Sequence, residues 1–78
     1  MNFLTEKIQK YHEKKLNDAL QELKFHQEVK KRLETNLKTT YDESKKGIEE
    51  EIDKENKIID IWKNNIEKMN EQLKKLKN

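Results

Sequence analysis

The chain has 78 residues, of which 31% are hydrophobic and 44% are charged, and its formal net charge is +2. This length allows one domain at most, and so few apolar residues exclude a large buried core. The absence of cysteine excludes a disulfide framework and a zinc site with thiolate ligands. The chain has no proline and one glycine and is rich in Leu, Lys, Glu, Gln and Asn, which is typical of long helices or coiled coils.

The first predicted element is a helix over about residues 3–38. Apolar residues recur there at steps of mostly three and four, which places them on one broad face of a helix. One set shares a single heptad frame at positions a and d: Leu16, Ala19, Leu23, Leu33 and Leu37. A second set lies beside it at positions c and g: Leu4, Ile8, Tyr11, Phe25 and Val29. A face this wide indicates more than one partner helix.

A turn is expected over about residues 38–41, because the heptad frame does not continue through this stretch. Thr40 and Glu43 have the spacing of a capping box, so Thr40 is expected to cap a second helix that begins near Tyr41. In a second interpretation Ser44 is the cap and Gly47 lies in a looser loop, which would shorten the second helix by a turn.

The second predicted helix covers about residues 41–77 and carries the cleaner repeat. Its seam residues alternate by four and three, and only Glu55 among them is not apolar: Ile48, Ile52, Glu55, Ile59, Trp62, Ile66, Met69, Leu73 and Leu76. Ile58 and Ile61 flank this seam and widen the apolar face beyond what one partner helix would cover.

The expected fold is all-α, a single helical domain over residues 1–78 that forms an antiparallel, coiled-coil-like two-helix hairpin. We expect it to dimerise into a four-helix bundle, because one helix pair leaves Val29, Ile58 and Ile61 largely exposed. A turn at residues 38–40 places Ala19 opposite Ile59, Leu16 opposite Trp62, Leu23 opposite Glu55 and His26 opposite Ile52. The alternative is one long helix in a coiled-coil dimer, since Gly47 costs only about 1 kcal/mol inside a helix.

Glu55 is a carboxylate at a d position, which destabilises a helical seam unless the group is paired or reaches solvent. His26 lies within reach in this register, so His26 and Glu55 are candidates for a polar contact in the core. The other interpretation is an edge position from which the Glu55 side chain extends into water. His12 and His26 lack the Glu-x-x-His or His-x-x-x-His spacing of helical metal sites, so neither a metal nor another cofactor is expected.

Charge is distributed unevenly along the chain. Residues 42–60 carry a net charge of −4, residues 61–78 carry +3 and residues 1–18 carry +1. The acidic stretch is expected to face basic residues of the first helix, namely Lys24, Lys30, Lys31 and Arg32. The end with both termini is lysine-rich, and its candidate nucleic-acid contacts are Lys10, Lys14, Lys15, Lys63, Lys68, Lys74, Lys75 and Lys77.

The low total charge, the interleaved glutamates and the single arginine favour a solvated face over a nucleic-acid site at this end. In outline, without a shared motif, the chain resembles the plasmid repressor-of-primer type of hairpin. That resemblance implies a dimeric four-helix bundle and RNA binding on a helix face.

An enzyme is not expected, because a narrow two-helix rod offers no concave pocket for converging catalytic groups. The favoured function is a small protein-interaction module, such as an adaptor, an assembly factor or an inhibitor encoded by a phage or plasmid. Its expected partners are a second copy and a larger protein, bound through Phe25, Val29, Ile58, Ile61 and Trp62. The alternative is a dimeric bundle that binds RNA or DNA through its lysine-rich end.

No apolar run has the length of a signal peptide or a membrane span, so a cytoplasmic protein without membrane contact is expected. The preference for lysine over arginine, with many asparagines and isoleucines, is typical of AT-rich genomes, including those of low-GC bacteria, their phages and their plasmids.

Overall fold

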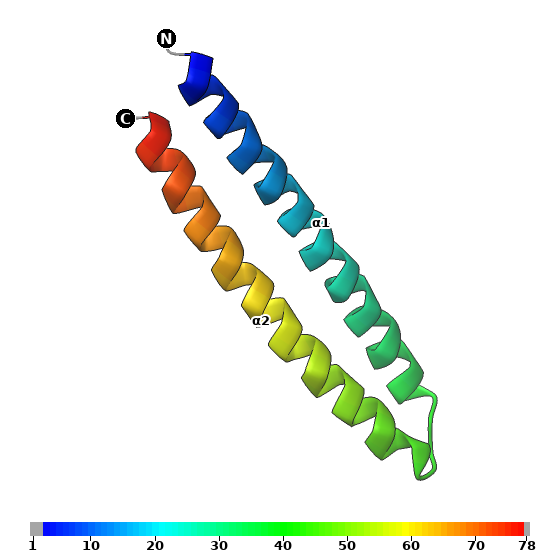
Figure 1. The fold of residues 1–78 in the computed structure, drawn as a ribbon. Helices are drawn as coiled ribbons and strands as arrows, with labels where there is room; N and C mark the ends of the chain where they lie inside the picture. The colour runs from blue at the N-terminus through cyan, green and yellow to red at the C-terminus, as the bar shows by residue number, and fades with distance from the viewer. Residues whose placement is uncertain (1–2, 78) are drawn as a thin grey trace.

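The structure is a computed structural model that describes residues 3–77, without the side chain of Lys77. The described chain forms two helices, α1 (Phe3–Lys38) and α2 (Ser44–Lys77), and contains no strand. Figure 1 shows the helices side by side and antiparallel, joined by a short loop at one end and with both termini at the other. The predicted all-α hairpin is therefore confirmed, and the alternative of one uninterrupted helix is wrong.

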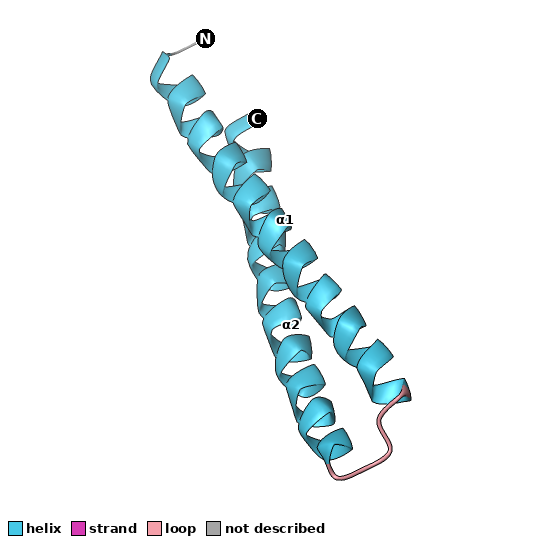
Figure 2. Cartoon of the chain, turned by 90° about the vertical axis from the view of Figure 1, so that its right-hand side faces the viewer, coloured by secondary structure: helices cyan, strands magenta, loops and turns pink. Residues whose placement is uncertain are grey.

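The hairpin is a narrow rod. Its principal extents are 62 × 14 × 12 Å and its radius of gyration is 17.9 Å. A compact domain of this length would have a radius of gyration of about 11.5 Å. Figure 2 shows that the two helices cross as they run along each other, as coiled-coil partners do. Every residue that the structure describes is thus at or near the surface.

The seam between the helices is made by the a and d positions that the sequence predicts. Only three of its apolar side chains are buried, Ala19, Ile59 and Leu73, and the most buried of them, Ala19, retains 2% of its accessible surface. The remaining apolar seam residues are half-buried, among them Leu16, Leu23, Leu33, Ile52, Trp62 and Ile66. One helix pair therefore encloses only a small core.

Near its start α1 turns polar residues toward α2 and apolar residues away from it. Thr5, Gln9 and His12 occupy the a and d positions and are half-buried. Ile8 and Tyr11, at g and c, retain 40% and 59% of their accessible surface. Intrachain packing alone does not account for the apolar residues at this end of α1.

The loop differs from the predicted turn in the hydrogen bonds that its residues make. The hydroxyl of Thr40 donates to the carbonyl oxygen of Asn36 at 2.7 Å, so Thr40 is bonded back to the end of α1. The same carbonyl oxygen also accepts from the backbone N–H and the hydroxyl of Thr39. The carboxylate of Asp42 accepts from the backbone N–H of Ser44 at 2.9 Å, which is the contact of an N-cap. The predicted start of the second helix near Tyr41, with Thr40 as its cap, is therefore wrong.

The second interpretation of this stretch is right about the later start and wrong about the residues. Ser44 is the first residue of α2 and not its cap, and Gly47 lies within the helix and not in a loop. Asp42 is the cap because its side chain accepts from the backbone N–H of Ser44, whereas the hydroxyl of Thr40 is bonded to the end of α1.

The longer loop also changes the register of the hairpin. His26 lies opposite Glu55 and not opposite Ile52 as predicted. The offset of three residues is close to one helical turn. The predicted pairings of Ala19 with Ile59, Leu16 with Trp62 and Leu23 with Glu55 belong to the same register and shift with it.

Candidate functional site

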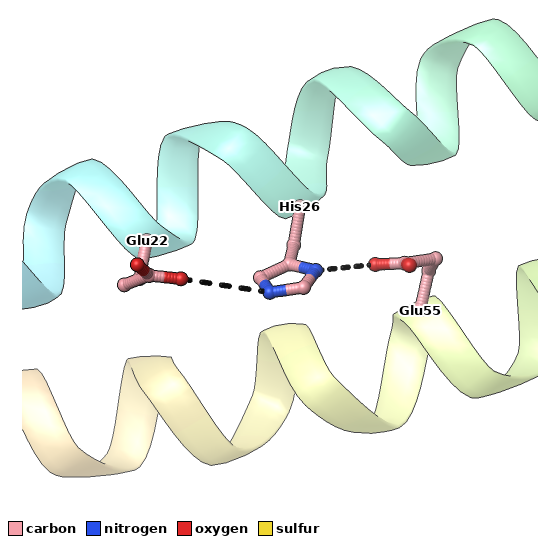
Figure 3. Close-up of polar contacts among 3 residues, drawn as sticks. All are labelled: Glu22, His26 and Glu55. Carbon is pink, nitrogen blue, oxygen red and sulfur yellow. Dashed lines mark hydrogen bonds and ion pairs between the residues drawn. The ribbon is translucent and has the colours of Figure 1, made fainter.

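A polar contact joins the two helices within the apolar seam. The Nδ1 atom of His26 lies 2.7 Å from Oε2 of Glu55 (Figure 3). An ionised carboxylate can only accept, so Nδ1 carries the hydrogen and donates it. The two side chains retain 18% and 16% of their accessible surface, which shields the bond from water on most sides. The structure thus brings together the two residues predicted for a polar core contact, through a register other than the predicted one.

Glu22 approaches the other ring nitrogen of His26. Its Oε2 lies 3.8 Å from Nε2, and its side chain is 53% exposed. Figure 3 shows Glu22 and Glu55 on opposite sides of the imidazole ring, so the two carboxylates do not converge on one point. Within residues 3–77 no group of three or more His, Cys, Asp or Glu side chains is arranged to hold a metal ion. The arrangement serves to tie α1 to α2.

Four of the five apolar residues predicted to bind a partner lie outside the seam, whereas Trp62 is a half-buried seam residue at position d. Phe25 and Ile61 are exposed by 53% and 57%. Val29 and Ile58 are half-buried. In heptad terms Phe25 and Ile61 are at c, and Val29 and Ile58 are at g, so each helix carries an apolar stripe beside its seam.

Two shallow grooves show which side of the rod these stripes occupy. One runs along the side of the e and b positions and includes Glu13, Asn70 and Lys74. The other runs along the side of the g and c positions and is lined by Lys15, Asp18, Ala19, Glu22, Trp62 and Met69. Because e positions of both helices meet on the first side, the g positions of both helices meet on the second. The apolar stripes of α1 and α2 therefore share one side of the hairpin.

We call this side the apolar face. Its residues are Leu4, Ile8, Tyr11, Phe25, Val29, Ile58, Ile61 and Trp62. On the opposite side, the e position Leu20 is 45% exposed and its neighbours along the rod are mostly charged or amide residues. Most of the exposed large apolar side chains of α1 and α2 thus lie on one side of the hairpin.

Aromatic rings connect the apolar face to the polar groups beside it. The ring of Phe25 meets that of His26 edge-on, with centroids 5.2 Å apart. The ammonium group of Lys15 lies 5.5 Å from the centroid of the Tyr11 ring. Such a contact between a cation and a ring is worth about 0.5–1 kcal/mol at an exposed site, so Lys15 covers Tyr11 without burying it.

The lysines of the basic end do not gather on one side. Those that the structure describes are all exposed, and they occupy heptad positions b, c, e, f and g: Lys10, Lys14, Lys15, Lys63, Lys68, Lys74 and Lys75. The side chain of Lys77 lies outside the described residues. A duplex or a single strand that contacted one side would therefore meet only part of this set.

Apart from the contact between His26 and Glu55, the described charged side chains form no ion pair between α1 and α2. Both ion pairs within the described part of the chain involve His26. The expected pairing of the acidic stretch with Lys24, Lys30, Lys31 and Arg32 does not take the form of direct contacts among these residues. Exposed pairs of this kind contribute little to stability, so the hairpin does not depend on them.

Sequence reasoning placed Ile8 and Tyr11 on a second seam but did not include them in the partner-binding set. The signal was available in Thr5, Gln9 and His12, since three polar residues at consecutive a and d positions indicate that the apolar ones face elsewhere.

No helix of residues 3–77 is long and apolar enough to cross a membrane. No protein-family model matches the chain, and no significant match was found among curated proteins or solved structures.

Proposed function

We propose that the chain is a non-enzymatic protein-interaction module that binds protein through its apolar face. The observation that carries this proposal is the inversion at the start of α1, where Thr5 and Gln9 face α2 while Ile8 and Tyr11 face solvent. An isolated hairpin would be more stable with the opposite arrangement. An apolar stripe kept outside the seam is the signature of a surface that another protein covers.

The small core supports the same proposal. Ala19, Ile59 and Leu73 are the only buried hydrophobic residues among those described. Phe25 and Ile61 expose more than half of their surface on the apolar face. Covering such side chains contributes about 1.5–3 kcal/mol each when burial is complete. A bound helix or helix pair supplies the apolar contacts that one hairpin lacks.

A four-helix bundle is the simplest assembly of this kind. A second two-helix layer on the apolar face would enclose Val29, Ile58 and Trp62 between the layers, at the helix separation of about 8–10 Å usual for packed helices. The opposite, polar side would remain in water. An adaptor or an inhibitor of a larger protein could use the same face by contributing its two helices to the partner's core.

The test is site-specific photo-crosslinking. A photoreactive side chain is placed at Ile61, on the apolar face, and in a matched variant at Leu20, an exposed apolar position on the opposite side. Both full-length variants are irradiated in nuclease-treated extract at low and at high salt. We expect protein adducts from position 61 that persist at high salt, and none from position 20.

The proposal would be overturned if position 61 yielded no protein adduct. It would equally be overturned if the two positions yielded the same adducts, because the apolar face would then have no special role. If position 61 gave none and the chain were retained on RNA or DNA in a salt-sensitive manner, binding through the lysine-rich end would replace protein binding as the function.

A further inference from the structure

We infer that the occupant of the apolar face is a second copy of the chain, stacked antiparallel so that α2 lies on α2 about a two-fold axis near Ile61. This inference rests on the proposed function and adds the identity and orientation of the partner. Three features of the rod support it: its distribution of charge, the spacing of its apolar residues and the alignment of the midpoints of α1 and α2 along the rod.

Charge favours the antiparallel orientation. Residues 42–60 of α2 and its preceding loop carry −4, and residues 61–78 carry +3. Antiparallel stacking of α2 on α2 places the acidic half of each copy against the basic half of the other. Stacking with both turns at one end would bring like halves to the same level. These charges are available, because no Lys or Arg side chain among residues 3–76 is ion-paired to a carboxylate within the hairpin.

The apolar residues of α2 lie where such an axis would pass. Ile58 and Ile61 are near the midpoint of α2, which runs from Ser44 to Lys77. A two-fold axis through that midpoint places Ile61 beside Ile61 of the second copy, with Ile58 within a turn of it. An isologous interface needs a surface that complements itself in this way.

The apolar residues of α1 match under the same axis. The hydrogen bond between His26 and Glu55 shows that the midpoints of the two helices are level, because each residue lies equally far from the midpoint of its own helix. Tyr11 and Val29 lie on opposite sides of the midpoint of α1, at about 14 Å and about 13 Å along the helix. Rotation about the axis therefore places Tyr11 of each copy beside Val29 of the other.

One pair of charges opposes this arrangement. Asp18 and Glu22 lie close to the midpoint of α1, at c and g positions on the same side as Ile61. In the dimer the four carboxylates of two copies would approach one another near the axis, with one Lys15 from each copy about a turn away. Their mutual repulsion would weaken the dimer, particularly at low salt.

The chain has no cysteine, so single-cysteine variants report directly on this geometry. We expect light scattering to give twice the chain mass of 9.5 kDa for the unmodified protein. We expect Ile61→Cys to form a disulfide-linked dimer on oxidation, and the control Leu20→Cys to remain unlinked. A mixture of Tyr11→Cys and Val29→Cys chains should yield the mixed disulfide in preference to either symmetric one.

Two further variants measure the interface in unlinked protein. Ile61→Ser should raise the dissociation constant of the dimer by about tenfold or more, since both copies lose an apolar contact at the axis. The matched Leu20→Ser should leave it unchanged. Asp18→Asn should lower the dissociation constant several-fold, because the repulsion near the axis is reduced. Circular dichroism of each variant verifies that the helices are intact.

A monomer at all concentrations would overturn the second copy as partner while leaving protein binding through the apolar face in place, as crosslinking at position 61 to a heavier protein would show. A dimer in which Tyr11→Cys and Val29→Cys do not link to each other would overturn the antiparallel orientation. Linkage through Leu20→Cys would overturn the choice of face. Absence of any adduct at position 61 would instead contradict the proposed function itself.

Discussion

The hydrogen bond between His26 and Glu55 is the one polar contact that crosses from α1 to α2 among the described residues. Apolar seam residues pack acceptably in more than one register, whereas a short bond between two particular polar groups forms in only one. A single polar pair in an otherwise apolar seam can therefore set the register at some cost in stability. This role fits a rod whose buried core is too small to choose among registers by shape.

We predict that a double-mutant cycle with His26→Leu and Glu55→Leu gives a coupling energy of about 1–3 kcal/mol. Each single change leaves a half-buried polar group without its partner. The double variant should unfold with a free energy equal to or above that of the original chain, because leucine at both positions continues the apolar seam. Urea denaturation gives the free energy of unfolding of the three variants and of the original chain. Additive single effects would show that the contact does not contribute in solution.

Gly47 has no structural requirement for glycine. It lies within α2, its φ is not positive, and a Cβ at this position would meet no atom within 4 Å. We predict that Gly47→Ala raises the free energy of unfolding by about 1 kcal/mol, since alanine loses less backbone entropy in a helix. Thermal denaturation followed by circular dichroism tests this. A loss of stability would show instead that another chain packs closely against Gly47.

At the level of the helices, the loop decides where α2 begins. Asp42 caps α2 and Thr40 binds back to α1, so the two ends are stabilised by separate side chains. The spacing of Thr40 and Glu43 predicted a capping box because this motif considers only the start of the second helix. That spacing does not show that the hydroxyl of Thr40 instead donates to a carbonyl oxygen at the end of α1.

We predict that Asp42→Ala lowers the free energy of unfolding by about 1 kcal/mol, because it leaves an N–H group at the start of α2 without its acceptor. Thr40→Ala should have a smaller effect, since its hydroxyl serves only an exposed carbonyl. Chemical denaturation of both variants gives the comparison. A larger loss for Thr40→Ala would mean that Thr40 caps α2 in solution, as the spacing alone predicts.

For the whole molecule, the rod shape means that the radius of gyration distinguishes face-to-face from end-to-end association. Face-to-face stacking of two layers about 10 Å apart would raise the radius of gyration only from 17.9 Å to about 19 Å, because the length of 62 Å is unchanged. End-to-end association of two such rods would instead give a value of about 36 Å, since the centres would be about one rod length apart.

We therefore predict that small-angle scattering of the protein in its dimeric form gives a radius of gyration close to that of one hairpin, with twice the mass. Ile61→Ser at the same concentration should restore the mass of one chain with little change in radius. A long particle would contradict association through the apolar face and would direct attention to the ends of the rod.

The sequence by itself determined the two helices, their lengths to within a few residues and the a and d positions of the seam, because heptad spacing is a local property of a helix. It also singled out His26 and Glu55, since polar groups at d positions stand out against leucine and isoleucine. The tertiary structure alone decided the register and the side on which the outlying apolar residues meet. The register depends on the length and hydrogen bonding of the loop, where one turn of difference moves His26 from Ile52 to Glu55. The shared side of the apolar stripes follows from the antiparallel direction of the helices, which brings the g positions of α1 and α2 together.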